Sequence, residues 1–191
     1  MRPIIPIPAS PKAPYPILVR SSHVIPGFGR GSSEIGIPTA NVPIDSSPEL
    51  ANLDTGVYFG FVRLHRAREE DLPETKEILR ADKKTKVKLT YGRGLTDIDL
   101  SVLPMVMSLG WNPYFKNEEK ACELHILHKF GTSFYGSSIS FNVLGYIRPE
   151  LDYTTLEDLI KDIHIDIETA EEYLKKDGYK GFAGQLQSET N

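Results

Sequence analysis

SSISFNVLGYI, the stretch from residue 137 to residue 147, alternates polar and apolar side chains along most of its length. Ile139, Phe141, Val143 and Ile147 would share one face of an extended strand, while Ser138, Ser140 and Asn142 would share the other. A two-residue period of this kind is typical of a strand with one buried face. The stretch therefore predicts a β-strand that covers a core.

Shorter stretches elsewhere carry the same kind of signal, and glycines and prolines separate them. They are residues 15–19, 23–25, 39–42, 57–64, 87–91, 102–109 and 121–127. Many short strands in a chain of 191 residues favour a closed or nearly closed antiparallel barrel. We therefore expect a mainly β fold.

The helical signal lies near the C-terminal end, where apolar residues recur every three or four positions. These are Leu156, Leu159, Ile160, Ile163, Ile167, Ala170 and Leu174. Thr154 and Glu157 have the spacing of a capping box at the helix start. Asp166 could begin a second helix, so two helices with a bend near His164 are an alternative. We expect this segment to pack on the barrel and close one side of it.

Three segments lie outside the barrel domain, which we expect to span residues 15–175. Residues 1–14 are a proline-rich lead, since six of the first 16 residues are proline, and we expect it to be solvated and polyproline-like. Residues near 65–100 carry dense mixed charge and predict a solvated loop and hairpin insertion without chemistry of its own. Residues 176–191 are expected to form a C-terminal tail.

Composition limits the classes of protein to consider. Apolar residues make up 40% and charged residues 25%, as in an ordinary globular protein. The net charge of −4 argues against a general nucleic-acid binder. A single cysteine, Cys122, excludes an internal disulfide, and no apolar stretch is long enough to cross a bilayer. With no signal core at the N-terminus, we expect a cytoplasmic protein, and we expect it to be a monomer.

The run GFGRG, residues 27–31, places three glycines at alternate positions. Such a backbone can approach another group closely, and its successive N–H groups can point at a phosphate. Arg30 could add a charged fork. A bare turn without a ligand fits the run equally well. The run is not a Walker A loop, because no Gly-Lys-Ser/Thr follows it.

The segment PTAN, residues 38–41, carries two polar side chains that would point to one face of an extended strand, Thr39 and Asn41. A hydroxyl and an amide oxygen are hard ligands of the kind that Mg²⁺ accepts beside phosphate oxygens and water. The alternative is a polar strand end that faces solvent.

Three further positions could carry chemistry, each with a plainer alternative. Glu123 lies in an apolar-flanked strand, where it could accept a proton from a substrate hydroxyl, or simply face solvent beside His125. The aromatic cluster at residues 110–115 could cradle a flat ring or cover a core edge. Arg148 could pair with a carboxylate or a phosphate, or form a surface salt bridge.

Two kinds of site are not supported by the sequence. The histidines do not have metal-ligand spacing with cysteines or carboxylates, which argues against a zinc-ligand cluster. No Gly-x-Ser-x-Gly elbow is present, so a Ser-His-Asp nucleophilic site lacks its usual setting.

The order of these motifs is more specific than any one of them. GFGRG (27–31) is followed by GIPTAN (36–41), GVYFG (56–60), SLGWNP (108–113), ELHI (123–126), FYG (134–136) and GYIRPE (145–150). Over residues 15–175 the chain resembles the riboflavin kinase family in its eukaryotic single-function form. The resemblance implies a six-stranded antiparallel Greek-key β-barrel with a C-terminal α-helical segment. It also implies transfer of the γ-phosphoryl group of ATP to the 5′-hydroxyl of riboflavin, which yields FMN and ADP.

The resemblance further implies roles for residues that match the family's motifs. Glu123 matches the catalytic base. The nucleotide positions are Gly27, Gly29, Arg30, Gly31, Ser33, Thr39, Ile126, His128 and Tyr135. The flavin positions are Trp111, Arg148, Tyr153 and Leu156, with Arg148 on a mobile loop. Thr39 and Asn41 would hold the metal, Mg²⁺ or Zn²⁺, with ATP as co-substrate.

Two departures and two rival hypotheses accompany the resemblance. Ser33 stands where the family often has a lysine, and the insertion at residues 65–100 is longer than in compact members. No His-x-x-His or His-x-Gly-His motif is present, so FAD synthesis is not expected. The rivals are a non-catalytic flavin-binding barrel, which Thr39, Asn41 and the glycine run disfavour, and an oligonucleotide-binding barrel, which the charge and the lack of a basic-aromatic stripe disfavour.

Overall fold

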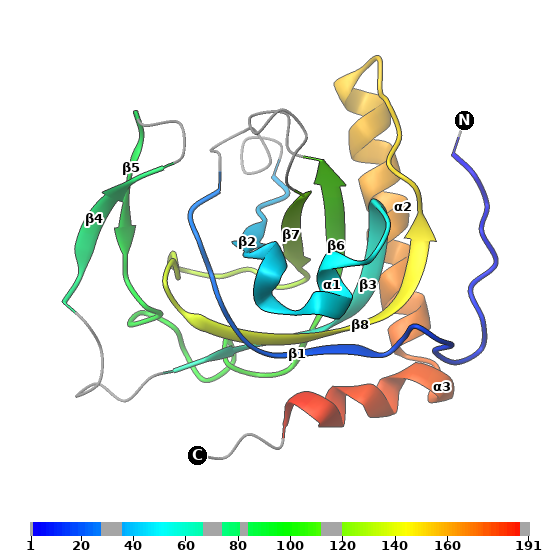
Figure 1. The fold of residues 1–191 in the computed structure, drawn as a ribbon, viewed down its shortest axis with the longest axis horizontal. Helices are drawn as coiled ribbons and strands as arrows, with labels where there is room; N and C mark the ends of the chain where they lie inside the picture. The colour runs from blue at the N-terminus through cyan, green and yellow to red at the C-terminus, as the bar shows by residue number, and fades with distance from the viewer. Residues whose placement is uncertain (1, 28–35, 67–73, 81–83, 112–119, 188–191) are drawn as a thin grey trace.

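The computed structural model describes residues 2–27, 36–66, 74–80, 84–111 and 120–187. Six strands form one curled antiparallel sheet in the order β1-β8-β3-β6-β7-β2 (Figure 1). They are β1 (Ile17–His23), β2 (Ala40–Val42), β3 (Gly56–His65), β6 (Leu103–Trp111), β7 (Lys120–Ile126) and β8 (Ser138–Arg148). The expected mainly β class and the six antiparallel strands are confirmed.

In the described residues, the two edge strands, β1 and β2, meet at a single point beyond the end of β1. There the amide of Ile25 donates to the carbonyl of Asn41 over 2.9 Å. The amide of the preceding residue, Val24, donates to the carbonyl of Ser137 over 2.9 Å. The sheet is therefore a half-barrel whose edges are linked by one bridge. The short stretches expected at 15–19 and 23–25 belong to β1 and this extension of it.

The stretch that predicted the fold forms β8, the longest strand. Ile139, Phe141 and Val143 are buried in the core inside the curled sheet, as the alternation predicts. Ile147, expected on the same face, lies instead in the core on the outer face, because the pairing of β8 with β3 shifts register before it. Ser140 and Asn142, expected on a polar face, are buried as well. Asn142 is satisfied there, because its Oδ1 accepts from the amide of Phe61 and its Nδ2 donates to the carbonyl of Phe182. Both faces of β8 are therefore covered.

A second core lies on the outer face of the sheet, beneath helix α2 (Leu156–Leu174). Val57 and Phe59 of the sheet pack there with Ala170 and Leu174 of the helix. The helix is continuous, so the alternative of two helices with a bend near His164 is wrong.

The helix begins one residue later than its capping signal suggested. Thr155, not Thr154, is the N-cap; its hydroxyl accepts from the amide of Asp158 over 3.1 Å. The hydroxyl of Thr155 in turn donates to Oδ2 of Asp158 over 2.8 Å, so the cap is made by a pair of residues one position after the predicted pair.

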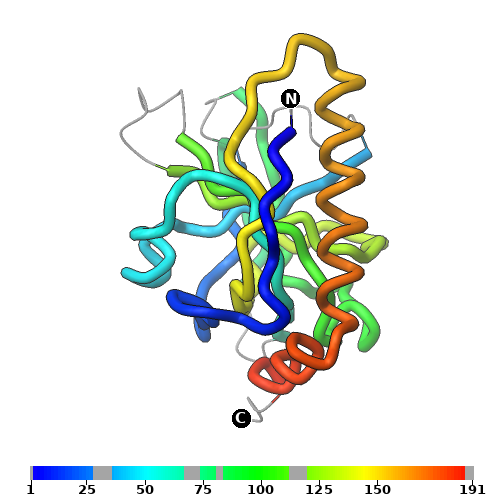
Figure 2. Tube along the Cα trace, turned by 90° about the vertical axis from the view of Figure 1, so that its right-hand side faces the viewer, coloured from blue at the N-terminus to red at the C-terminus, as the bar shows by residue number. Residues whose placement is uncertain are grey.

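The expected tail is part of the fold. Residues after α2 form α3 (Asp177–Lys180) and the 3₁₀ helix η4 (Gly181–Leu186), which bring Tyr179 and Leu186 into the outer core. The proline-rich lead also packs on the protein rather than extending into solvent. The hydroxyl of Tyr179 donates to the carbonyl of Pro8 over 2.9 Å, and Figure 2 shows this N-terminal segment running close to α2.

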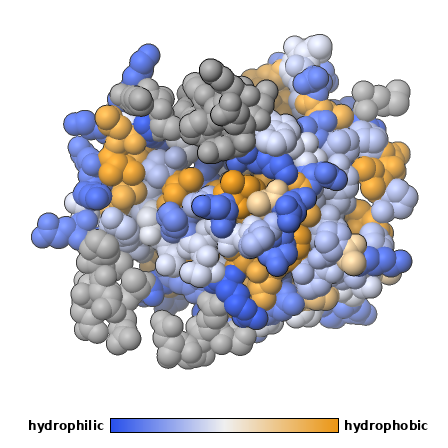
Figure 3. All heavy atoms as spheres, in the orientation of Figure 1, coloured by the Kyte–Doolittle hydropathy of each residue, from blue (hydrophilic) through white to orange (hydrophobic). Residues whose placement is uncertain are grey.

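The charged insertion forms a separate hairpin of β4 (Lys76–Leu79) and β5 (Lys86–Leu89), far from α2 in Figure 1. The stretch expected at 87–91 is thus a strand of this hairpin and not of the main sheet. The face in Figure 3 is largely hydrophilic, with apolar atoms near its centre and on the hairpin at the left. A 3₁₀ turn, η1 (Ile44–Ser46), and the short α1 (Pro48–Ala51) connect β2 to β3. No helix in the described ranges is long and apolar enough to span a membrane.

Candidate active site

A row of directly paired residues crosses five strands of the sheet. Asn41 of β2 pairs with Glu123 of β7, which pairs with Ser108 of β6, which pairs with Val57 of β3, which pairs with Arg148 of β8. Residues directly opposite each other in antiparallel strands point to the same face. The row therefore places candidate metal, base and flavin positions on one face, although their sequence numbers differ by up to a hundred or so.

Thr39, Asn41 and Glu123 form a polar centre at one end of this row. The hydroxyl of Thr39 donates to Oε2 of Glu123 over 3.1 Å, and all three residues are partly exposed. The two predicted metal positions and the predicted base are thus brought together.

Gly27 lies against the same centre. A Cβ atom on this glycine would come within 2.3 Å of Nδ2 of Asn41, so only glycine lets the chain pass here without moving that side chain. The start of the glycine run therefore adjoins Asn41, the predicted metal position. Gly29, Arg30, Gly31 and Ser33 lie outside the described residues.

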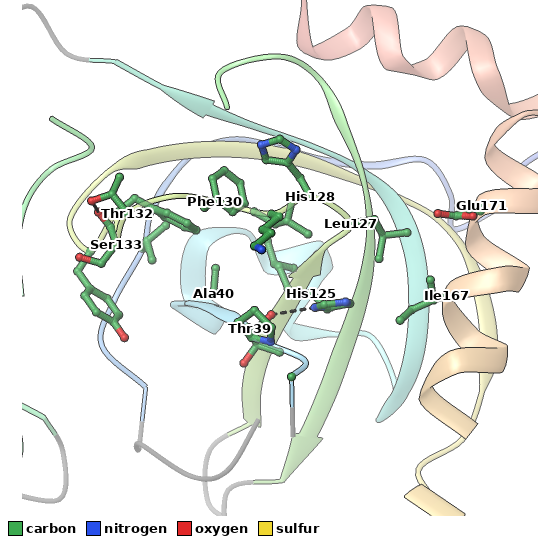
Figure 4. Close-up of a pocket in the computed structure, with 18 residues that line it drawn as sticks. Thr39, Ala40, His125, Leu127, His128, Phe130, Thr132, Ser133, Ile167 and Glu171 are labelled. Atoms are coloured by element: carbon green, nitrogen blue, oxygen red, sulfur yellow. Dashed lines mark hydrogen bonds between the residues drawn. The ribbon is translucent and has the colours of Figure 1, made fainter. Parts of the chain in front are cut away.

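A cavity of about 810 Å³ adjoins Thr39 (Figure 4). Its lining includes four of the predicted nucleotide positions: Thr39, Ile126, His128 and Tyr135. Phe130, Thr132 and Ser133 come from the loop after β7, and Ile167 and Glu171 approach from α2. The volume is that of a typical small-molecule site.

His128 is held in this cavity by Asp99, a residue that the sequence did not single out. Nε2 of His128 lies 2.7 Å from Oδ1 of Asp99. The other carboxylate oxygen of Asp99, Oδ2, accepts hydrogen bonds from the backbone amide and from the hydroxyl of Thr96, each over 2.7 Å. The bonds from Thr96, and then the one from His128, lower the pKa of Asp99 below its ordinary value despite its burial. Since an ionised carboxylate only accepts hydrogen bonds, we assign the hydrogen to Nε2 of His128.

Arg148, a predicted flavin position, lies at the other end of the row. Arg148 is the last residue of β8 and is 4% exposed, so in this structure it is neither a loop residue nor part of a surface salt bridge. Its guanidinium binds Asp166 of α2 through Nη2–Oδ2 at 2.7 Å and through Nε to both oxygens at 3.1 Å. Nη2 of Arg2 contacts the other oxygen of Asp166 at 2.7 Å. Asp166 is therefore an ion-pair residue and not a helix start.

Tyr153 lies beside this ion pair, with the guanidinium of Arg148 at 6.0 Å from its ring centre. Its hydroxyl donates to Oδ2 of Asp162 over 2.8 Å, and burial, followed by this bond, raises the pKa of Tyr153 to about 12. Leu156, at the start of α2, is 52% exposed. The structure thus joins Arg148 and Tyr153, and it leaves the side chain of Leu156 about half exposed.

Trp111, at the end of β6, is 49% exposed and lies under the ammonium of Lys120, 5.5 Å from the ring centre. Its neighbour Gly110 adjoins Glu150, because a Cβ on Gly110 would lie 2.1 Å from Oε1 of that residue. The end of β6 and the segment after β8 are therefore adjacent, but Trp111 alternates to the face opposite Ser108, so the structure does not bring its side chain together with Arg148.

Comparison with known proteins decides the family. The model of the family described as Flavokinase: Riboflavin kinase matches residues 14–174. The chain belongs to the riboflavin kinase family. Among its relatives, the riboflavin kinase of Kluyveromyces lactis is 55% identical over 175 residues, which cover 91% of this chain and 92% of that protein. The riboflavin kinase of Scheffersomyces stipitis is 52% identical over 181 residues, covering 95% and 97%.

The fold agrees with this family. The crystal structure of riboflavin kinase from Trypanosoma brucei aligns with a TM-score of 0.61 and covers 92% of each chain, at 20% sequence identity. At that identity the likeness concerns the fold of this riboflavin kinase family member and not the roles of its residues.

The polar residues that sequence reasoning missed in this riboflavin kinase family member share one property. Each of them contacts or lies opposite a predicted site residue that is distant in the sequence. Asp99 binds His128, Ser108 lies opposite Glu123, and Asp166 binds Arg148. The spacing of Thr96 and Asp99 was a weak local signal for a side-chain turn, but nothing in the sequence connected that turn to His128. Asp166 was seen only as a candidate helix start.

Proposed function

We propose that this protein transfers the γ-phosphoryl group of ATP to the 5′-hydroxyl of riboflavin and so makes FMN and ADP. Family membership supports the proposal, as do relatives named riboflavin kinase that match it over nine tenths of their length. The observation that carries it is the hydrogen bond from Thr39 to Glu123, opposite Asn41 and beside the 810 Å³ cavity. It groups a candidate base and hard oxygen ligands at the mouth of a small-molecule site.

ATP would occupy the cavity that Thr39, Ile126, His128 and Tyr135 line. Ile126 and the rings of the following loop offer apolar contact to the base, while the phosphates would lie toward Thr39 and Gly27. With a net charge of −4, the protein would bind this anion through local donors rather than through a broad basic surface.

The donor set fits a magnesium ion carried in with the nucleotide. Magnesium usually takes one or two protein oxygens and completes its shell with phosphate oxygens and water, and Thr39 and Asn41 supply such oxygens. Resident zinc prefers several His, Cys or carboxylate ligands, and the described residues contain no group of three of these that could hold a metal. Bound there, Mg²⁺ would neutralise phosphate charge during the transfer.

Glu123 would act as general base. Its Oε2 accepts from Thr39, which orients the carboxylate, and the other oxygen would take the proton of the 5′-hydroxyl as that oxygen attacks the γ-phosphorus. The new O–P bond forms as the bond to the β-phosphate oxygen breaks, and ADP leaves with that electron pair. A positioned base contributes roughly 10²–10⁴ in rate.

Riboflavin would extend from Glu123 past Ser108 toward the segment after β8 that contains Tyr153. It would not cross Val57, the next residue of the row, because that side chain is buried beneath α2. Ser108 would face the ribityl chain, and Tyr153, beside Arg148, would supply aromatic contact for the ring.

The test is to incubate the protein with riboflavin, ATP and Mg²⁺ and to separate FMN from riboflavin by chromatography. Glu123→Gln should lower turnover about 10²–10⁴-fold while riboflavin binding, followed by flavin fluorescence, survives. Glu157→Gln, an exposed change on α2, is the control and should behave as wild type. Wild-type turnover in Glu123→Gln would remove Glu123 from the mechanism. Bound flavin without any FMN from the wild-type protein would instead favour a non-catalytic flavin-binding barrel.

A further inference from the structure

The charged hairpin of β4 and β5 is attached to the rim of the nucleotide cavity by residues at both of its ends. After β5, the hydroxyl of Thr90 donates to the carbonyl of Ser133 over 2.8 Å, and the amide of Tyr91 donates to that of Tyr135 over 2.9 Å. Ser133 and Tyr135 both line the cavity. The insertion, which the sequence suggested was only a solvated extension, therefore touches the proposed ATP site.

Arg80, the residue that follows β4, makes the third attachment through its side chain. Nη2 donates to the phenolic oxygen of Tyr135 over 2.9 Å, and the guanidinium lies 5.6 Å from the centre of the same ring. Nη1 donates to the carbonyl of Gly27 over 3.5 Å, a long bond. One cation thus contacts both a side chain of the cavity and the first residue of the glycine run.

These two contacts link the cavity wall to the proposed metal position. Tyr135 belongs to the cavity wall, and Gly27 adjoins Asn41 at the metal position. Because the side chain of Arg80 reaches both from outside the main sheet, its position affects the distance between the wall and the glycine run. A change there would alter how the whole nucleotide fits.

The hydrogen bonding of Arg80 is also incomplete. Its Nε is buried and has no hydrogen-bond partner among the described residues. A buried cationic donor without a partner is costly, and an anionic ligand nearby would offset that cost. In addition, Tyr135 accepts the bond from Arg80, so its own phenolic hydrogen remains to be donated to a ligand oxygen.

We infer that Arg80, supplied by the insertion, is a positioning residue for the nucleoside triphosphate: it orients Tyr135 and the start of the glycine run, and it adds a positive charge beside the phosphates. This inference rests on the proposed function, because it takes the cavity to be the ATP site. It concerns the nucleotide alone, since no contact links Arg80 to the flavin positions in the described part of the chain.

The experiment compares Arg80→Met, which removes the charge and keeps the length, with Arg80→Lys, which keeps the charge. Lys88→Met is the matched control, an exposed cation of the same hairpin. Arg80→Met should raise the KM for Mg-ATP roughly tenfold and leave the KM for riboflavin unchanged. Arg80→Lys should recover part of the loss, and Lys88→Met should leave both constants at their wild-type values.

A second measurement separates positioning through Tyr135 from a general loss of structure. Tyr135→Phe should raise the KM for Mg-ATP as well, and the double variant with Arg80→Met should lose less than the two single effects combined. Equal effects of Arg80→Met and Lys88→Met would overturn the inference. So would a parallel rise in both KM values together with a lower melting temperature in every Arg80 variant.

Binding of Mg-ADP, measured by calorimetry, keeps this test distinct from the test of the reaction. If the wild-type protein made no FMN, the proposed function would fail. Weaker Mg-ADP binding in Arg80→Met than in Lys88→Met would still support the role of Arg80, and equal binding would contradict it.

Discussion

Thr39 donates its hydroxyl hydrogen to Glu123 over 3.1 Å, from the residue before β2 to the middle of β7. The bond connects positions 84 residues apart in the chain. It orders the carboxylate at a point where Asn41 lies directly opposite Glu123. A single threonine is thereby linked to the candidate base and, through its own oxygen, to the candidate metal position.

Thr39→Val tests whether Thr39 acts through its hydroxyl, as a donor to Glu123 and a ligand of the metal, or only through the space that its side chain fills. Valine keeps the shape of threonine but can neither donate to Glu123 nor offer an oxygen to the metal. We expect turnover to fall about 10²-fold and the concentration of Mg²⁺ needed for half-maximal rate to rise. Thr39→Ser, which retains the hydroxyl, should stay within a few-fold of wild type. A Thr39→Val enzyme as active as Thr39→Ser would contradict the assignment.

Gly27→Ala should damage the metal position without removing any ligand. The added methyl group would lie 2.3 Å from Nδ2 of Asn41, so either that side chain or the glycine run must shift. We expect a higher Mg²⁺ requirement in both Gly27→Ala and Asn41→Ala. The double variant should be little worse than Asn41→Ala alone, because the two changes disturb the same side chain. Fully additive effects in the magnesium titration would argue for separate sites.

Asp166→Asn should lower stability strongly, because it leaves two arginines around a neutral amide. Asp166 is 1% exposed and contacts both Arg148 and Arg2. Removing one partner of a buried ion pair typically costs about 3–5 kcal/mol, and urea denaturation would measure the loss. Arg2→Met should cost less, since Arg2 is more exposed than Arg148 and leaves the main pair intact. Equal losses in the two variants would count against this account.

The stabilising effect of Asp99 should depend on pH. The pKa of Asp99 is lowered in the folded protein, chiefly by the hydrogen bonds from Thr96. The ionised carboxylate therefore adds to the free energy of unfolding in full above the unfolded-state pKa, and this contribution is lost as the pH falls through the folded-state pKa. The difference in melting temperature between wild type and Asp99→Asn should be largest near neutral pH and shrink below a pH of about 4. A difference that stays constant down to pH 3 would exclude this linkage.

Cys122 should be inert to thiol reagents in the folded protein. It is 1% exposed in the core, and burial, with a smaller effect of Glu123, raises the pKa of its thiol. Because the thiolate is the reactive form, labelling should occur only when the protein unfolds, and its rate should rise steeply with denaturant. Rapid stoichiometric labelling in native buffer would show that β7 opens readily.

The alternation of polar and apolar residues predicted the strands well, but it did not predict which segments cover their outer faces. The alternation in β8 correctly predicts the inward-facing Ile139, Phe141 and Val143. It also predicted a solvated second face, but η4 and the C-terminal residues cover Asn142. The residues that provide this cover were expected to be a tail, because a short 3₁₀ segment carries no periodic signal of its own.

The candidate site could be predicted only in part for a similar reason. Thr39 and Asn41 could be placed on one face from strand geometry alone, and family resemblance added Glu123. The contacts of Asp99, Arg80 and Asp166 could not be foreseen, because their partners lie between 18 and 164 residues away. The assignment of Arg148 to the flavin side, which stays a prediction, gave no indication that the residue is buried in an ion pair.

The sequence by itself determined the strands, the amphipathic helix, the polar pairs within single segments and, through the order of its motifs, the family of this protein. Those features depend on backbone geometry and on hydrophobic periods that repeat over a few residues. Only the tertiary structure decided which strands are neighbours, and hence that Asn41, Glu123, Ser108 and Arg148 form one row. Strand register and long-range ion pairs result from packing the whole chain at once, so no local stretch contains them.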